Sequence, residues 1–143
     1  MCLCLNKRVI TTEQLQEQMK NGKRKFYKVY LDSSDKVLIS PYQASVVRGR
    51  GPGAIVSNRK GKDLTVYEII TGEVHFGIHV FVDEVEAREA KSLSISDGII
   101  VEVTAEPEDL VAAGSFSYDY ASAVFMKVCI SKKEWDRVMK ENK

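Results

Sequence analysis

The apolar positions of the chain follow two spacings, and the spacing of about four residues predicts helices. Leu15 and Met19 form an i, i+4 apolar pair. They follow Thr11 and Gln14, which suit a capping box, the arrangement in which two residues bond each other's backbone N–H groups. This pattern predicts a short helix over residues 12–21.

The same spacing predicts two further helices. Asp83 can cap a helix that runs to about Ser92, with Glu86 three residues later as the second half of a capping box. A capping-box pattern at residues 131–134 precedes a terminal helix. Its apolar residues at i, i+3 and i+4 are Trp135, Val138 and Met139.

The spacing of two residues, together with runs of β-branched and aromatic residues, predicts strands. The predicted strands cover residues 25–31, 37–39, 54–56, 64–70, 76–82, 99–104 and 123–130, and a helical turn at 107–110 ends near Gly114. Residues 76–82 are apolar on both faces, which is typical of a central, covered strand.

These elements do not alternate regularly as strand–helix–strand units. A sheet of five or six of these strands with three short helices is expected, and this order favours an α+β fold with a mixed or mostly antiparallel sheet. A length of 143 residues suits one hydrophobic core. No linker divides the chain, so residues 1–143 are expected to form a single domain.

Charge is distributed unevenly along a chain of otherwise ordinary composition. Apolar residues make up 44% and charged residues 29%, with a net charge of +1. Residues 48–62 contain five basic residues and no acidic one, so this segment carries +5 and the rest of the chain −4. A net charge near zero argues against bulk binding to nucleic acid or membrane. The basic segment indicates a localised anion site instead.

The basic segment combines glycine with arginine in a way that suits phosphate. Glycines let backbone N–H groups approach an anion, and arginines add paired hydrogen bonds to phosphate oxygens. The spacing is not that of a phosphate-loop motif, and a solvated, flexible loop is the alternative interpretation. The ligand-binding residues predicted in this segment are Arg48, Arg50, Gly51, Gly53, Arg59 and Lys62.

Aromatic residues and a histidine complete the predicted binding site. Tyr42, Tyr118 and Tyr120 could provide rings on which a base stacks. The alternative is that these tyrosines are half-buried packing residues at the sheet margin. His79 is a further candidate, with a packed histidine in an apolar strand as the alternative.

No pattern in the sequence predicts a catalytic residue or a cofactor. Candidate nucleophiles are scattered, and nothing resembles a nucleophile elbow or a Ser-His-Asp arrangement. The acidic residues of 83–89 and 102–109 look like solvated helix and turn faces. Glu102 is the exception, because it sits within a predicted strand and could point into a cleft.

The cysteines predict neither a metal site nor a disulfide framework. A structural zinc needs about four ligands, and only Cys129, His75 and His79 could join Cys2 and Cys4. An odd number of cysteines without regular spacing suits a reducing compartment. No stretch is typical of a signal peptide or approaches the roughly 20 apolar residues of a membrane span. A cytoplasmic protein that does not bind membranes is therefore expected.

Several segments taken in order resemble small phage, prophage and gut-bacterial proteins. They are Met1-Cys2-Leu3, residues 26–29, Ser40-Pro41-Tyr42, Gly77 to Phe81 with the helix that follows, and Asp119-Tyr120-Ala121-Ser122. The resemblance covers most of residues 1–130. It implies a phage or mobile-element setting, hence the host cytoplasm, and the inhibition of host defence, including the sequestration of nucleotide signals.

A second resemblance is to the ADP-ribosyltransferase fold, which clamps NAD. Residues 77–81 followed by residues 85–91 are similar to its middle strand and helix. The sequence departs from the pattern at two positions. Lys28 stands where the first strand has arginine or histidine, and residues 123–125 offer no late glutamate. The resemblance therefore implies a degenerate member of that fold.

Three functional hypotheses follow. The first is a non-enzymatic protein that captures an anionic, nucleotide-derived small molecule. The second is an inhibitor that contacts a host defence protein, using the basic loop and an exposed sheet edge, where a homo-oligomer could also form. The third is an NAD-dependent ADP-ribosyltransferase-like enzyme that relies on His79 or Glu102.

Overall fold

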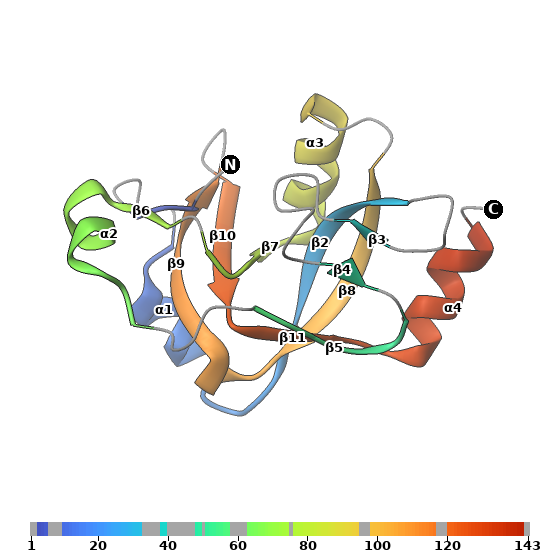
Figure 1. Cartoon of the computed structure of the whole chain (residues 1–143), viewed down its shortest axis with the longest axis horizontal. Coiled ribbons are helices and arrows are strands. Elements are labelled where there is room, and N and C mark those ends of the chain that lie inside the picture. The colour runs from blue at the N-terminus through green and yellow to red at the C-terminus, as the bar shows by residue number, and fades with distance from the viewer. Residues whose placement is uncertain are drawn as a thin grey trace.

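The structure is a computed structural model and describes only part of the chain. The described residues are 3–5, 10–32, 38–39, 48–49, 51–57, 63–74, 76–94, 98–116 and 120–141. Within them the chain forms a single α+β domain around a curved antiparallel sheet (Figure 1). The predicted fold class is confirmed.

The strands are β1 (Leu3–Cys4), β2 (Arg24–Asp32), β3 (Leu38–Ile39), β4 (Arg48–Gly49), β5 (Gly53–Val56), β6 (Glu73–Val74), β7 (Ile78–Phe81), β8 (Ile99–Ala105), β9 (Leu110–Phe116), β10 (Tyr120–Phe125) and β11 (Lys127–Ile130). The helices are α1 (Thr12–Gln18), α2 (Val66–Thr71), α3 (Glu84–Ser94) and α4 (Lys132–Glu141), and Pro107–Asp109 form a 3₁₀ turn. The described residues thus hold eleven strands and four α-helices, where five or six strands and three helices were predicted.

The sheet is organised around the long pairing of β2 with β8. The strand order is β5-β11-β8-β2-β7-β10-β9-β1-β6, and every pairing among the described strands is antiparallel. The β2–β8 register runs from Arg24 opposite Ala105 to Tyr30 opposite Ile99. At the far end of β2, Leu31 pairs with Ile39 of β3, which in turn pairs with Arg48 of β4. The strands predicted over residues 25–31 and 37–39 thus pair with each other.

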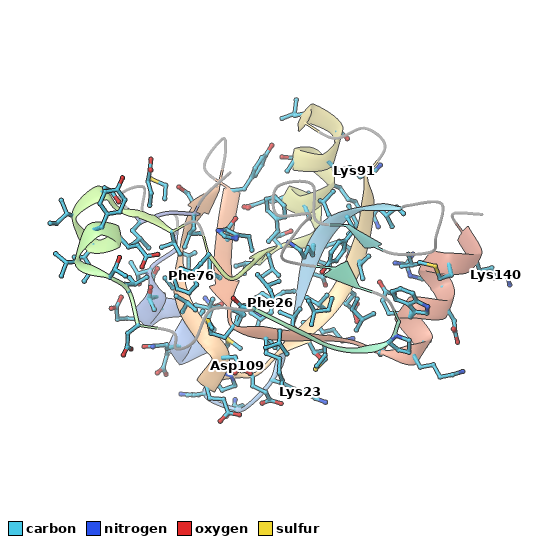
Figure 2. All side chains as sticks on the ribbon, in the orientation of Figure 1. Lys23, Phe26, Phe76, Lys91, Asp109 and Lys140 are labelled. Carbon is cyan, nitrogen blue, oxygen red and sulfur yellow. The ribbon has the colours of Figure 1, made fainter. Side chains whose placement is uncertain are left out.

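One face of the curved sheet encloses the main core. Alternate residues of β8 are buried, and Val101 and Val103 are fully enclosed. Phe26 of β2 lies near the middle of the molecule, with its ring centroid 4.8 Å from that of Phe125 (Figure 2). Helix α1 contributes Leu15, and α4 contributes its own apolar face to this core. The other face of the sheet packs against α3.

Close backbone packing at one end of the sheet requires a glycine. Strand β1 pairs with β9 at Cys4 and Ser115. A Cβ atom at Gly114 would collide with the carbonyl oxygen of Cys4. Only glycine lets the two backbones lie this close.

A buried lysine occupies the place where β2 and β7 separate. Tyr27 pairs with Phe81, but the ladder does not continue to the next pair. The Lys28 ammonium donates a hydrogen bond of 2.9 Å to the carbonyl oxygen of His79. It also lies 5.3 Å from the centroid of the Tyr30 ring. Burial lowers the pKa of Lys28 to about 7, because a buried charge loses its hydration.

Helix α2 (Val66–Thr71) covers most of the strand predicted over residues 64–70, so that prediction is wrong. The hydroxyl of Thr65 accepts a hydrogen bond from the N–H of Glu68, and the Glu68 carboxylate accepts one from the N–H of Thr65. Gly72 ends α2 in the left-handed conformation, at φ +71°. The β-branched composition favours a strand, but the capping box at one end and the glycine at the other determine a helix.

The last predicted strand is divided into two strands in the structure. Residues 123–130 form the end of β10 and all of β11, not one strand. The break is at Met126, whose N–H donates to Asp109 and whose carbonyl accepts from the N–H of Ser57. It lets β10 pair with β7 and β9 while β11 pairs with β5 and β8. The helical turn predicted to end near Gly114 is limited to Pro107–Asp109, and residues 110–116 form β9 instead.

The buried lysine makes stability depend on pH in the alkaline range. The unfolded chain holds the Lys28 proton up to a pKa of about 10.4, whereas the folded chain releases it near pH 7. The unfolded state therefore binds more protons between these values, and the free energy of unfolding should rise with pH across this window. Lys28→Met should remove this rise and add about 1 kcal/mol or more of stability at pH 6–7.

Urea denaturation of both proteins from pH 6 to pH 10 measures the effect. Lys20→Met is the matched control, because Lys20 lies just after α1 in an exposed ion pair with Glu17. Parallel curves for the native chain and Lys28→Met would contradict the assignment of a desolvated amine.

Candidate functional site

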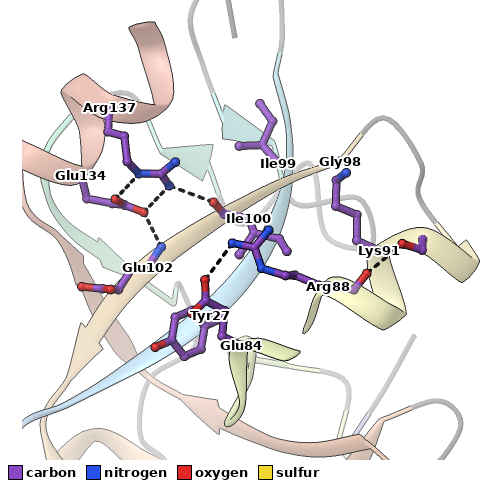
Figure 3. A pocket seen from close by; sticks show the side chains of 11 residues that line it. Tyr27, Glu84, Arg88, Lys91, Gly98, Ile99, Ile100, Glu102, Glu134 and Arg137 are labelled. Carbon is purple, nitrogen blue, oxygen red and sulfur yellow. Dashed lines mark hydrogen bonds and ion pairs between the residues drawn. The ribbon is translucent and has the colours of Figure 1, made fainter. Parts of the chain in front are cut away.

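A polar pocket of about 690 Å³ lies between α3 and α4, over the ends of β2 and β8 (Figure 3). We call it the interhelical pocket. Its lining residues are Tyr27, Glu84, Arg88, Lys91, Ser92, Gly98, Ile99, Ile100, Glu102, Glu134 and Arg137. The volume falls in the range of small-molecule sites in proteins.

Helix α3 forms one wall because of the spacing of its small and charged residues. Asp83 caps the helix by accepting a hydrogen bond of 2.7 Å from the N–H of Val85, as predicted. Ala87 and Ala90 are buried against the sheet, and their small side chains bring the helix close to it. Glu84, Arg88 and Lys91, spaced at i, i+4 and i+7, therefore share a neighbouring face that borders the pocket.

Glu86 has a different role from the predicted one. Its carboxylate accepts a hydrogen bond of 3.2 Å from the N–H of Ala121 in β10, and so ties α3 to the sheet.

Helix α4 forms the opposite wall by binding the edge of β8. The Glu134 carboxylate accepts a hydrogen bond of 2.7 Å from the N–H of Glu102. Arg137 donates to the carbonyl oxygen of Ile100 at 3.2 Å and to Glu134 at 2.7 Å. These two side chains take the hydrogen bonds that a neighbouring strand would make, since the β11 pairing with β8 lies further along, at Thr104.

The pKa of Glu134 reflects this arrangement. Partial burial opposes its ionisation, but the hydrogen bonds from Arg137 and from the N–H of Glu102, with the charge of Arg137, outweigh burial. The pKa of Glu134 is therefore lowered, and the carboxylate stays charged at neutral pH.

The floor of the pocket carries a tyrosine beside two carboxylates. Tyr27 and Glu102 are opposite each other in the β2–β8 ladder, so their side chains share a face. Burial, with smaller effects from the nearby charges of Glu84 and Glu102, raises the pKa of Tyr27. The phenol therefore remains protonated at neutral pH and can donate a hydrogen bond.

The cations of the pocket are not all engaged by its carboxylates. Glu84 pairs with Arg88 at 2.9 Å, and Glu102 pairs at 3.5 Å with Lys25, which lies outside the lining. Within the described part of the chain, no ion pair involves Lys91. The Lys91 ammonium is thus placed to meet a ligand.

Half of the predicted ligand-binding residues lie outside the described part of the chain. This applies to Arg50, Arg59, Lys62, Tyr42 and Tyr118, whose predicted roles stay predictions. The backbone of Arg48 lies in β4, two strands from Leu31 of β2. Gly53 begins β5 with a positive φ of +118°, which bears out the conformational role of glycine here, and a Cβ at Gly51 would meet no neighbour within 4 Å.

The two other described candidates serve as packing residues. The His79 ring nitrogen Nε2 lies 3.0 Å from the carbonyl oxygen of Val74, and burial lowers the pKa of His79 to about 4. Tyr120 is buried, with its ring edge-to-face against Phe81 at 6.2 Å between centroids. Neither residue lines the interhelical pocket.

Metal chemistry finds little support in the described residues. Among them, no group of three His, Cys, Asp or Glu side chains could hold a metal ion. The Cys4 and Cys129 thiols are free, and they lie on β1 and β11, which are separated by five strands in the sheet order.

Sequence analysis found one residue of the interhelical pocket and missed the others. Glu102 was expected to face a cleft, and it lines the pocket. The charged residues of α3 were interpreted as a solvated face, because spacing alone does not reveal what lies opposite. For Glu134 the sequence signal was half right. Its N–H bonds the Ser131 hydroxyl as a capping box requires, but its carboxylate binds β8.

The contact between α4 and β8 should contribute measurably to stability. Glu134→Ala leaves the Glu102 N–H without its acceptor, and we expect a loss of about 1–3 kcal/mol in the free energy of unfolding at pH 7. The pKa of Glu134 is lowered in the folded state, so its contribution is present above about pH 4.3 and lost as pH falls through the folded value. The difference between the two proteins should narrow in acid.

Asp136→Ala is the matched control, since Asp136 is on the same helix and pairs at 3.4 Å only with the exposed Lys132. Its cost should stay below about 0.5 kcal/mol. Equal losses for the two variants in urea denaturation would show that the β8 contact has no special weight.

Comparisons with models of protein families, with curated proteins and with solved structures found no match. No helix of the described residues combines the length and apolar character needed to cross a membrane. The residues of the interhelical pocket therefore carry the functional proposal.

Proposed function

We propose that the protein is a non-enzymatic binding protein that captures an anionic, nucleotide-derived small molecule in the interhelical pocket. The observation that carries the proposal is the convergence of Arg88, Lys91 and Arg137, from two helices, on a pocket floored by Tyr27 (Figure 3). Cations suit phosphate, and a tyrosine ring suits a base.

The three cations have different tasks. Arg137 is fixed by Glu134 and by the carbonyl oxygen of Ile100, so it shapes the wall and contributes charge. Arg88 is held by Glu84 at only one described contact and keeps guanidinium hydrogens available. Lys91 extends towards Gly98 at the rim, where a phosphate can be met by its ammonium (Figure 3).

The shifted pKa values support binding more than acid–base catalysis. A residue that transfers protons works best with a pKa near the operating pH. In the pocket, the pKa of Tyr27 is raised from 10.0 and that of Glu134 is lowered from 4.5, so both move away from neutrality. Of the two residues that the enzyme hypothesis names as alternatives, Glu102 lines the pocket and His79 does not.

Sequestration is the biological role that we attach to this binding. The resemblance to phage proteins supports a setting in which a host nucleotide signal is removed by capture, in the host cytoplasm. Capture needs affinity and no turnover, which agrees with a site built of fixed charges.

Loss of one rim cation should weaken binding without affecting the fold. Lys91→Ala should raise the Kd for the nucleotide by about tenfold or more, because a charge-assisted hydrogen bond contributes about 1.5–3 kcal/mol. Isothermal titration calorimetry against cyclic nucleotides, nucleoside monophosphates and ADP-ribose measures this. Lys132→Ala, a change of the same kind on the exposed side of α4, should leave Kd unchanged. No binding across the panel at millimolar concentration would refute the proposal.

A second candidate function is contact with a host protein, and the surface of α2 favours it. Glu68 is buried, whereas the apolar residues of the helix face solvent. Their side chains are 64–76% exposed, namely those of Val66, Tyr67, Ile69 and Ile70. Helix α2 lies at the end of the molecule opposite α4 (Figure 1). An apolar helix face turned to solvent is typical of an interaction site.

Charge indicates the kind of partner that α2 fits. Asp63 and Glu73, both exposed, flank the helix at its two ends. A second copy of the chain would bring these carboxylates towards each other, which is repulsive. A protein with an apolar groove rimmed by lysine or arginine is complementary.

A charge placed on α2 should abolish this contact while preserving the fold. Ile70→Lys should change stability by less than about 0.5 kcal/mol, since Ile70 is 76% exposed. It should also abolish salt-sensitive co-purification of one host protein. Val85→Lys, at an exposed apolar position of α3, should preserve that co-purification. Concentration-dependent self-association through α2, seen by analytical ultracentrifugation, would contradict this candidate.

A further inference from the structure

Opposite charges alternate in the interhelical pocket, where Glu84 pairs with Arg88 and Glu134 with Arg137, but the two ends of the pocket differ. In Figure 3, the Arg137 guanidinium and the Lys91 ammonium lie towards one end, and the Glu102 carboxylate lies towards the other, near Tyr27. The proximity of the carboxylates to Tyr27 does not depend on the view. Both Glu84 and Glu102 raise the pKa of the Tyr27 phenol, which requires that their charges lie near it. A ligand must therefore present different chemistry to the two ends.

The charge count limits how much negative charge the ligand can bring. Three cations and three carboxylates line the pocket, and Lys25 adds one positive charge through its contact with Glu102. The local balance is thus +1. A single phosphate group carries about −1.5 to −2 at neutral pH and fits this balance. A triphosphate would place further charge near Glu84, Glu102 and Glu134, which is unfavourable.

The acidic end offers hydrogen-bond acceptors rather than a place for an anion. A carboxylate has about four acceptor positions, and one ion pair leaves some of them open. Glu84 has one described partner, Arg88, and Glu102 has one, Lys25, through the carboxylates. Hydroxyl groups are the natural donors here, because acidic side chains commonly bind the hydroxyls of ribose in nucleotide sites. A vicinal diol presents two such donors side by side.

We infer that the ligand is a ribonucleotide with one phosphate group, bound with its phosphate at Lys91 and Arg88 and its ribose hydroxyls at Glu84 and Glu102. This inference rests on the proposed function and narrows it. The Tyr27 ring lies at the acidic end, beside Glu102, and provides the surface on which the base or sugar packs. The protein distinguishes ligands by their sugar and by their number of phosphates. Side chains held on helices and strands contact both groups.

The test compares matched ligands by isothermal titration calorimetry on the whole chain. The probes are AMP, dAMP, GMP, dGMP and ATP. We expect each ribonucleotide to bind about tenfold or more tightly than its 2′-deoxy form, since a deoxy ligand leaves a carboxylate without its donor. We also expect ATP to bind more weakly than AMP.

Two variants assign the effect to the carboxylates. Glu84→Gln and Glu102→Gln should each reduce the ratio between the ribose and deoxyribose ligands to about threefold or less. Both variants should also reduce the ratio of the ATP to the AMP dissociation constant, because each removes a negative charge from the pocket. Glu17→Gln, a change of the same kind in an exposed ion pair on α1, should alter neither ratio.

The outcomes separate this inference from the proposed function. Equal binding of ribose and deoxyribose forms, with affinity that Lys91→Ala still weakens, would overturn the inference and leave nucleotide capture in place. Tighter binding of ATP than of AMP would overturn it in the same way. Failure of all five probes to bind at millimolar concentration would overturn the inference. The proposed function would fall with it only if cyclic nucleotides and ADP-ribose also failed to bind.

Discussion

The hydrogen bond from the N–H of Glu102 to the Glu134 carboxylate joins the sheet to its C-terminal helix. Strand β8 would otherwise present a free edge beyond its contact with β11. The Glu134 carboxylate and the Arg137 guanidinium bind this edge as a strand would, one accepting and one donating. Edges left open invite pairing with other chains. The same contact fixes α4 beside the pocket. One set of hydrogen bonds therefore both covers the edge of β8 and positions a wall of the site.

The two walls of the interhelical pocket are held by different forces. Helix α3 is placed by apolar contact, through Ala87 and Ala90, and by the Glu86 hydrogen bond to β10. Helix α4 is placed by its charged contacts with β8 and by Val138 in the core. The charged side chains between the walls are thus carried on elements that cannot easily move. Such preorganisation favours selective capture, because less order has to be imposed when the ligand binds.

Local chemistry in the sequence was enough for several elements. The capping box at Thr11 and the caps at Ser131 and Asp83 placed three helix starts correctly. Local chemistry misled for α2, where two local signals disagree. The β-branched residues favour a strand, whereas a capping box begins the segment and a left-handed glycine ends it. The composition of these residues predicts a strand, but the hydrogen bonds at the two ends of the segment determine a helix.

The sequence by itself determined the α+β class, the central position of β7 and the polar face of α3, because alternation, spacing and caps act within a few residues. Only the tertiary structure decided where that face points. Tyr27, Arg88 and Arg137 are far apart along the chain, and they meet because β8 pairs with β2 while α3 and α4 pack beside it. The Glu134 carboxylate binds the N–H of Glu102, which is 32 residues away, and no local pattern specifies such a contact.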